Sequence, residues 1–198
     1  VAWGPVNQLT SVNTSGYDVK NPSVTFIDNT NALVVYESIG STYTINARKF
    51  DGSSWGSSVS VSGNQSYSQS SPSVCVAPNG RIWVTWHGRD ATDSGADNIR
   101  VAYSNDGGQT WSAMTKLTNG NSYSQQYPSI ASNINGEVFV VWHGNDSASP
   151  TYYNIFKVKY SSGSWGSIAK VTNATTASRY YPCALTDISL NYSEPLFI

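Results

Sequence analysis

The two histidines of the chain, His87 and His143, stand in the same Trp-His-Gly tripeptide. Each one closes an apolar run and precedes a polar loop, which begins at residues 89–90 or 145–146. A histidine in this place can hold the loop by bonding the backbone, or it can face a ligand. Two histidines without HxH or HExxH spacing do not predict a zinc site.

Tyrosines recur beside these loops. Tyr67 and Tyr123 each precede a proline by five residues, and Arg179 stands near the corresponding proline of the last unit. Hydrogen-bonding groups beside aromatic rings suit sugars, whose hydroxyls need polar partners and whose C–H faces stack on rings. The residues expected to bind a ligand are His87, His143, Tyr67, Tyr123, Arg89, Asp90, Asn145, Asp146 and Arg179.

No metal site or cofactor is expected. Asp90, Asp93 and Asp97 are close enough in sequence to hold Ca²⁺, but they lack the spacing of an EF-hand loop, so calcium is a weak alternative.

An internal repeat positions these residues. A proline opens a strand-like run four times with spacings of 50, 56 and 54 residues, and a tryptophan recurs four times with spacings of 52, 56 and 54. Two independent markers therefore share a period of about 54 residues. The repeats span approximately 3–54, 55–110, 111–164 and 165–198, and the last one is incomplete.

Each repeat contains four short strand-like runs, here called A to D from the proline. Strand B is apolar on both faces at residues 82–86 and 138–142, which indicates a strand covered on both sides. Asn-Gly pairs between strands A and B favour hairpins. The sequence predicts an all-β propeller of four-stranded antiparallel blades, with about three and a half blades in this chain, either one domain or part of one.

Strand direction decides which turns share a face. The short A–B and C–D turns lie on one face, and the longer D–A and B–C loops lie on the other. Function is more common on long, decorated loops. We therefore expect the candidate residues on the D–A and B–C face, with repeat symmetry giving equivalent shallow sites on adjacent blades.

The segment Ser104–Trp111 fits the pattern S-x-D-x-G-x-T-W between strands C and D. It resembles the Asp box of the sialidase-like, bacterial neuraminidase repeat family of β-propellers, and the resemblance extends over the chain through the recurring tryptophan. Ser104 and Asp106 are predicted to brace the turn, Gly108 to allow it, and Trp111 to anchor it between blades. Asp-box turns in that family lie away from the ligand, so the motif predicts the fold and no activity.

For a sialidase, the resemblance implies three arginines that bind the substrate carboxylate, a Tyr–Glu pair that supplies the nucleophile, and an Asp that acts as the acid. Among the arginines only Arg89 and Arg179 are expected on the loop face, because Arg81 lies at an A–B turn and Arg48 and Arg100 lie within strand C. The incomplete set favours a non-catalytic carbohydrate-binding or adhesion module. A fragment of a sialidase-like glycoside hydrolase and a structural module of a phage tail-type or surface assembly are the alternatives.

Composition narrows the partners. Charged residues make up 12% of the chain and the net charge is −1, so nucleic acid is not an expected partner. The sequence contains no run of 18 apolar residues, so membrane insertion is not expected. The composition suits an extracellular, cell-surface or virion-surface protein. Both ends of the sequence look cut, so we expect self-association or a missing remainder of the chain to close the propeller. We expect Cys75 and Cys183 to be buried thiols.

Overall fold

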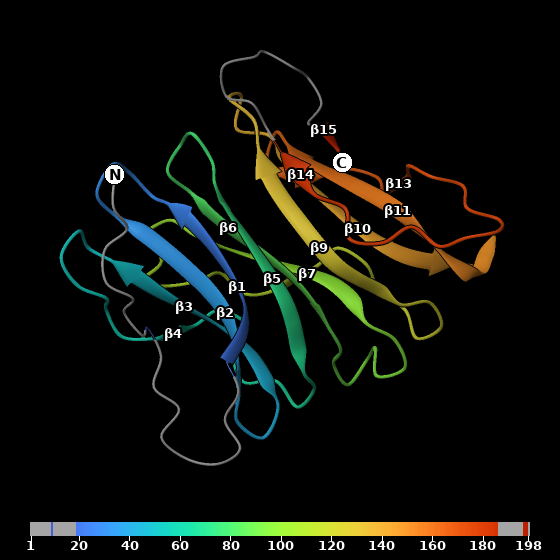
Figure 1. The fold of residues 1–198 in the computed structure, drawn as a ribbon, viewed down its shortest axis with the longest axis horizontal. Helices are drawn as coiled ribbons and strands as arrows, with labels where there is room; N and C mark the ends of the chain where they lie inside the picture. The colour runs from blue at the N-terminus through green and yellow to red at the C-terminus, as the bar shows by residue number, and fades with distance from the viewer. Residues whose placement is uncertain (1–8, 10–18, 186–195, 198) are drawn as a thin grey trace.

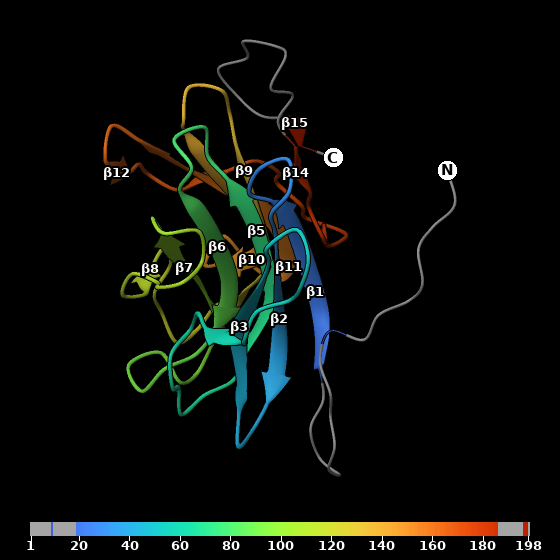
Figure 2. The ribbon, with the colours of Figure 1, turned by 90° about the vertical axis from the view of Figure 1, so that its left-hand side faces the viewer.

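The computed structural model describes residue 9, residues 19–185 and residues 196–197. Within these residues the protein consists of strands and turns, without a helix. Two four-stranded sheets and one five-stranded sheet follow one another along the chain and lie side by side (Figure 1), and each presents a face to the next (Figure 2). The run that precedes the first repeat proline at residues 6–9, a strand D by the repeat pattern, falls almost wholly outside the described residues.

Each sheet, called a blade below, has its strands in sequence order. Blade 1 contains β1 (Val19–Phe26), β2 (Ala32–Ile39), β3 (Tyr43–Phe50) and β4 (Val59–Ser60). Blade 2 contains β5 (Gln69–Val76), β6 (Ile82–Gly88), β7 (Asn98–Ser104) and β8 (Thr115–Lys116). Every pairing within these two blades is antiparallel.

Blade 3 contains β9 (Gln125–Ser132), β10 (Val138–Asp146) and β11 (Ser149–Ser161), and its edge is formed by β12 (Ser164–Trp165) and β13 (Ala169–Lys170). The last strands, β14 (Ala184–Leu185) and β15 (Leu196–Phe197), pair antiparallel. The predicted all-β architecture of four-stranded antiparallel units is therefore confirmed. The total number of blades stays a prediction.

The innermost strands begin three residues earlier than the prolines suggested, because each contains a β-bulge. In β5, Ser70 pairs with His87 and Ser73 pairs with Thr85, so Ser71-Pro72 stands opposite Trp86 alone. Blades 1 and 3 have the same register shift. The residue before the proline has positive φ each time: Asn21 (51°), Ser71 (55°), Tyr127 (50°) and Tyr181 (53°).

The hydrophobic core lies between blades. One cluster joins Leu33, Val35 and Ile45 of blade 1 to Val84 and Trp86 of blade 2. A second cluster joins Trp83 and Ile99 of blade 2 to Val140, Trp142 and Phe156 of blade 3. All residues of β6 are buried, as expected for a strand covered on both faces.

The serine after each proline ties its blade to the next. Val74 N–H donates to Ser23 Oγ at 3.3 Å, Ile130 N–H to Ser73 Oγ at 3.2 Å, and Ala184 N–H to Ser129 Oγ at 3.0 Å. Cys183 occupies the same place after Pro182. It is exposed, so the expectation of a buried thiol was wrong there, because no described blade follows it.

The turn at Ser104–Trp111 is braced by side chains. Gly108 N–H donates to Ser104 Oγ at 2.9 Å, and the Gln109 and Thr110 N–H groups donate to Asp106 Oδ1 at 3.0 and 2.9 Å. The hydrogen bonds from Thr110, first its hydroxyl, then its amide, hold the pKa of Asp106 well below its usual range. A Cβ at Gly108 would lie 2.7 Å from Leu33 Cδ1 of blade 1, and Trp111 packs on the same inter-blade cluster.

This geometry predicts a stability role for the turn. Asp106→Ala should lower Tm and leave any ligand binding unchanged, because it removes acceptors for two backbone amides. Trp111→Ala should cost more, about 3 kcal/mol, because it leaves a cavity between blades. Thermal unfolding with Gln109→Ala as a same-turn control checks both. An unchanged Tm together with lost binding in Asp106→Ala would contradict the structural role.

Blade 1 has one uncovered face. Val24 and Phe26 of β1 are 66% and 73% exposed, whereas Val74 and Ile130, at the place of Val24 in blades 2 and 3, are 8% and 4% exposed because a preceding blade covers them. No blade among the described residues therefore covers this apolar face of β1.

We predict that the 198-residue chain self-associates through such open faces. Val24→Ser/Phe26→Ser should shift the assembly toward the monomer because it removes apolar area from the contact. Light scattering of both proteins measures this. A wild-type chain that is monomeric at all concentrations and binds no dye for exposed apolar surface would contradict the prediction.

Candidate functional site

The residue before the proline in β5 and β9, and Tyr181 before Pro182, each turn one backbone N–H away from their own sheet. That N–H donates to a side chain at the end of strand B in the preceding blade. Ser71 N–H donates to Glu37 Oε1 at 2.5 Å, Tyr127 N–H to His87 Nδ1 at 3.2 Å, and Tyr181 N–H to His143 Nδ1 at 3.1 Å. Glu37, His87 and His143 thus hold successive repeats together at the innermost strands.

The hydrogen bonds define the state of both imidazoles. A nitrogen that accepts a backbone N–H needs its lone pair, so the neutral ring carries its proton on Nε2. Burial lowers the pKa of His87 to about 4, although Asp97 partly opposes the shift. Burial also lowers the pKa of His143 to about 4. Both rings are therefore neutral at pH 7, with the proton on Nε2, and both are buried: His87 is 7% exposed and His143 is 1% exposed.

Tyrosine rings surround these histidines. Tyr127 lies between His87 and His143 with centroid distances of 5.2 Å to each, and Tyr181 meets Tyr127 edge-on at 4.8 Å. Tyr153 and Tyr180 meet His143 edge-on, both at 5.2 Å. We call these six residues the axial aromatic cluster: His87, Tyr127, His143, Tyr153, Tyr180 and Tyr181.

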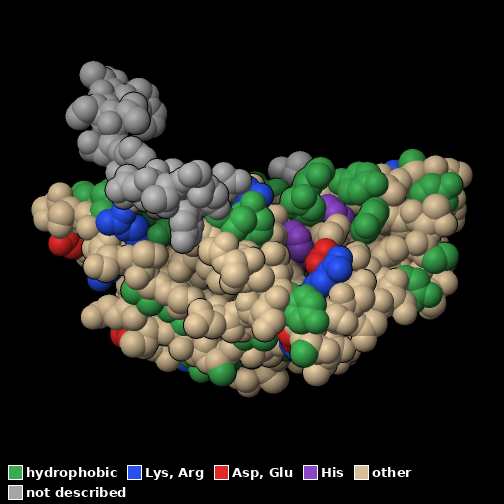
Figure 3. All heavy atoms as spheres, turned by 90° about the horizontal axis from the view of Figure 1, so that it is seen from below, with side chains coloured by type: hydrophobic (Ala, Val, Ile, Leu, Met, Phe, Trp, Pro, Cys, Tyr) green, Lys and Arg blue, Asp and Glu red, His purple; other side chains and the backbone are tan. Residues whose placement is uncertain are grey.

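The cluster presents rings to solvent. Tyr127, Tyr180 and Tyr181 are 38%, 53% and 65% exposed. Burial raises the pKa values of Tyr127 and Tyr153, so their hydroxyls stay protonated and can donate. In Figure 3 the histidines lie beside acidic and basic side chains and between hydrophobic ones, near the middle of the face seen from below.

A charged pair completes this region. Arg89 Nε donates to Asp97 Oδ1 at 2.9 Å, and Gln126 Nε2 donates to Asp97 Oδ2 at 2.6 Å. The electrostatic influence of Arg89 and Asp97 on the His87 pKa places the pair next to that ring. The Arg89 side chain is 41% exposed.

The bulges also form an axial cavity of about 300 Å³. Its lining consists of the four prolines and the residues before them: Asn21, Pro22, Ser71, Pro72, Tyr127, Pro128, Tyr181 and Pro182. The same backbone feature therefore joins the blades and aims Tyr127 and Tyr181 at the axis.

Glutamines hold the two Trp-His-Gly segments in place. Trp86 Nε1 donates to Gln69 Oε1 at 2.9 Å, and Trp142 Nε1 donates to Gln125 Oε1 at 2.7 Å. The same glutamines donate to the carbonyls of residues 89 and 145. A side chain larger than glycine at position 88 or 144 would collide with them, which explains the glycine after each histidine.

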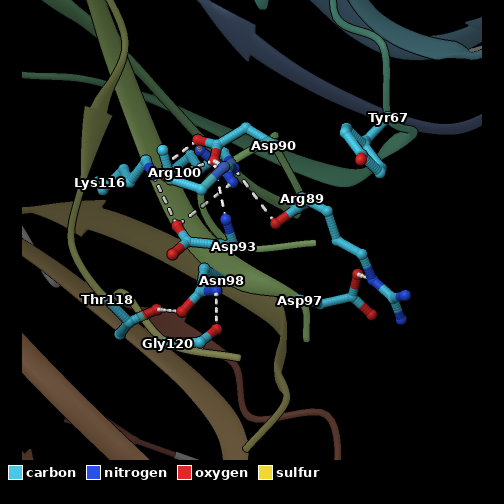
Figure 4. Close-up of polar contacts among 12 residues, drawn as sticks. Tyr67, Arg89, Asp90, Asp93, Asp97, Asn98, Arg100, Lys116, Thr118 and Gly120 are labelled. Atoms are coloured by element: carbon cyan, nitrogen blue, oxygen red, sulfur yellow. Dashed lines mark hydrogen bonds and ion pairs between the residues drawn. The ribbon is translucent and has the colours of Figure 1, made fainter. Parts of the chain in front are cut away.

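Asp90 lies in a separate charged network (Figure 4). Its Oδ2 is 3.0 Å from Nη1 of the buried Arg100 and 2.7 Å from Lys116 Nζ, and Lys116 also reaches Asp93 at 2.7 Å. Burial alone would raise the Asp90 pKa, but hydrogen bonds from Lys116, Thr92 and Arg100 bring it well below its usual range. These contacts fix the B–C loop of blade 2.

The other predicted residues are distributed over three places. Tyr123, Asn145 and Asp146 line a cavity of about 390 Å³ between blades 2 and 3. Arg179 directly precedes Tyr180 and is exposed. Its backbone N–H donates to Tyr153 O at 2.9 Å. Tyr67 lies apart from the Asp90 network in Figure 4. The structure thus brings His87, His143 and Arg89 together and separates them from Tyr123, Asn145 and Asp146.

The sequence analysis did not assign Tyr127, Tyr153, Tyr180, Tyr181, Asp97 or Gln126 to the site. One signal was available, because Tyr127 and Tyr181 both directly precede a repeat proline. No group of three His, Cys, Asp or Glu residues that could hold a metal is present in the described part of the chain, and calcium binding stays a prediction. No helix in that part could span a membrane.

Comparison with known proteins identifies solved structures that share the fold, but it identifies no family for the chain. No family model and no curated protein matches the sequence, so the Asp-box resemblance stays a prediction. Among solved structures, the GH93 α-L-arabinofuranosidase of Fusarium graminearum in complex with arabinobiose is similar at TM-score 0.61 and 15% identity, over 86% of this chain and 53% of that one.

Two further solved structures share the fold. A PL25 ulvan lyase aligns at TM-score 0.63 and 12% identity, over 84% of this chain and 47% of that one. A family 117 glycoside hydrolase from Zobellia galactanivorans aligns at TM-score 0.60 and 11% identity, over 90% and 64%. The chain spans about half to two thirds of the length of these structures. The chain is therefore an all-β protein of antiparallel four-stranded blades. It shares its fold with these three carbohydrate-active enzymes.

The histidine contacts predict a pH dependence. An unfolded histidine has a pKa near 6.5, and both folded rings titrate near 4, so the unfolded chain binds more protons between these values. Stability should be complete above pH 6.5 and should fall as the pH drops toward 4, by up to about 3 kcal/mol for the buried His87.

Urea unfolding at several pH values measures this loss. His87→Gln/His143→Gln keeps an acceptor for the backbone N–H but cannot titrate, so its stability should change less over the same range. A wild-type unfolding free energy that is constant from pH 6.5 to 4 would show that the histidines are not held in the neutral state.

Proposed function

We propose that the chain is part of a secreted or surface β-propeller that binds glycans without cleaving them, at the axial aromatic cluster. The observation that carries the proposal is the group of exposed tyrosine rings, Tyr127, Tyr180 and Tyr181, which pack on the neutral, buried histidines His87 and His143. Tyrosine hydroxyls bind sugar hydroxyls, and the exposed rings of Tyr180 and Tyr181 bind C–H faces.

The chemistry of the cluster favours binding over acid–base catalysis. An imidazole whose Nδ1 holds a backbone N–H and whose Nε2 carries the proton has no free lone pair with which to accept a proton. Glu37 is buried against Ser71, and Asp97 is paired with Arg89 and Gln126. A glycosidase needs two carboxyl groups that reach the substrate, whereas Asp97 is paired through both oxygens and Glu37 is fully buried, with no partner for its Oε2 among the described residues.

The electrostatic balance indicates a neutral saccharide. Arg89 is compensated by Asp97, and both histidines are uncharged at pH 7. A carboxylate or sulfate would need an uncompensated guanidinium for bidentate pairing. The surface is open, so each contact is weak, and useful affinity comes from several attachments at once.

A fragment of a glycan-cleaving enzyme is the second candidate. The observation that favours it is the common fold with an arabinofuranosidase, an ulvan lyase and a family 117 glycoside hydrolase. In that case, groups outside the described residues complete the catalytic set.

One experiment separates the two candidates. The chain is screened on a glycan array and titrated calorimetrically with arabinobiose and with the best array ligands, and each mixture is then examined for cleavage products. We expect binding with intact ligand, weakened about ten-fold by Tyr181→Ala, because a stacking ring is worth about 1 kcal/mol or more. Ile134→Ala, an exposed apolar residue on the opposite face, is the matched control.

Cleavage products would support the enzyme fragment. Binding that is intact in Tyr181→Ala would remove the axial aromatic cluster from the site. An absence of binding to every glycan would leave a structural module as the better description.

A further inference from the structure

A second cavity lies away from the axial aromatic cluster, between blades 2 and 3. It measures about 390 Å³, within the range of small-molecule sites. The loop from β8 to β9 supplies one wall, with Leu117 and Tyr123, and blade 3 supplies the other, with Trp142, Asn145 and Phe156. The cavity therefore exists only where two blades meet.

Its walls combine apolar rings with polar groups. The Trp142 and Phe156 rings are stacked, with a centroid distance of 6.0 Å and an interplanar angle of 16°. Asn145 donates through Nδ2 to Pro150 O at 2.8 Å, while its Oδ1 is buried and has no partner among the described residues. A buried acceptor of this kind needs a donor, and a ligand hydroxyl would supply it.

The corresponding place between blades 1 and 2 is filled by the protein itself. Phe156 pairs with Trp142 across the sheet, and Arg100 pairs with Trp86 in the same way, so Arg100 occupies the place of Phe156. The Arg100 side chain is fully buried and binds Gly88 O and Asp90. Blade 2 therefore has an internal cation where blade 3 has a ring beside a cavity.

We infer that this inter-blade cavity binds one unit of a neutral saccharide, independently of the axial aromatic cluster. Asn145 Oδ1 accepts a hydroxyl hydrogen, and the Tyr123 ring covers the sugar from the loop side. The charged groups at the cavity are balanced, because Lys170 Nζ lies 3.1 Å from Asp146 Oδ2. A neutral sugar fits this balance better than a uronic acid or a sulfated one.

NMR titration with matched reporters tests the inference. The methyl glycosides of glucose, galactose, mannose and arabinose are added separately to ¹⁵N-labelled chain, up to roughly 50 mM, well above the millimolar Kd of a weak site. At least one should shift the Trp142 indole N–H. The Trp86 indole, bonded to its glutamine in the same way, should not move.

Variants locate the site independently of folding defects in the core. Tyr123→Ala, in the loop, should raise the Kd about ten-fold or more, while Tyr67→Ala, its counterpart in the previous blade, should leave it unchanged. Phe156→Arg copies blade 2 and should abolish binding, with Asp146 available as partner for the new cation.

The two proposals fail separately. A shift at the His87 ring without one at Trp142 would overturn the inter-blade site and leave the axial site standing. A shift at Trp142 without one at His87 would do the reverse. Equal shifts at Trp86 and Trp142, or an unchanged Kd in Tyr123→Ala, would also overturn the inter-blade site.

Discussion

The arrangement of the blades depends on one backbone conformation, the left-handed residue before each repeat proline. A residue that precedes proline normally avoids helical φ and ψ values, and a positive φ outside glycine costs of the order of 1 kcal/mol or more. The cost is accepted four times, at Asn21, Ser71, Tyr127 and Tyr181. In return, three of these residues pass their N–H to Glu37, His87 or His143 in the preceding blade. The proline itself needs no partner, because it has no N–H.

This constraint joins stability to the proposed function. The sequence leaves two roles open for a histidine after strand B, holding the backbone or facing a ligand. The structure shows the first role, because Nδ1 of each ring accepts a backbone N–H of the next repeat and both rings are buried. Nδ1 of His143 bonds Tyr181, and this contact fixes the proton on Nε2. A substitution that removes the ring therefore disturbs the blade junction and the surface together, which is why tyrosine variants are the cleaner probes of binding.

The repeat made most of the fold predictable. Proline and tryptophan spacing gave the blades and the order of their strands, and the double-sided apolar runs gave the buried strand B. The site was less predictable, because its grouping depends on side-chain partners from distant loops. Asp90 is held by Arg100 and Lys116, which no local pattern indicates. Tyr127 belongs beside the histidines only because the bulge turns it toward the axis, and a bulge is invisible in hydrophobic periodicity.

Repeat symmetry also predicted equivalent sites on adjacent blades, and the chemistry of the blades argues for sites that differ. The aromatic residue opposite strand C is Tyr36 facing Asn46 in blade 1, Trp86 facing Arg100 in blade 2, and Trp142 facing Phe156 in blade 3. The shared backbone needs only an inter-blade acceptor, a proline bulge and a core-facing ring. The strand C residue opposite this aromatic residue meets none of those requirements. It can therefore fill the blade junction with an ion pair, as Arg100 does, or leave a cavity beside a ring, as Phe156 does. A ligand that spans the axial aromatic cluster and one blade junction would therefore meet unlike surfaces, and it would bind in one orientation rather than in several equivalent ones.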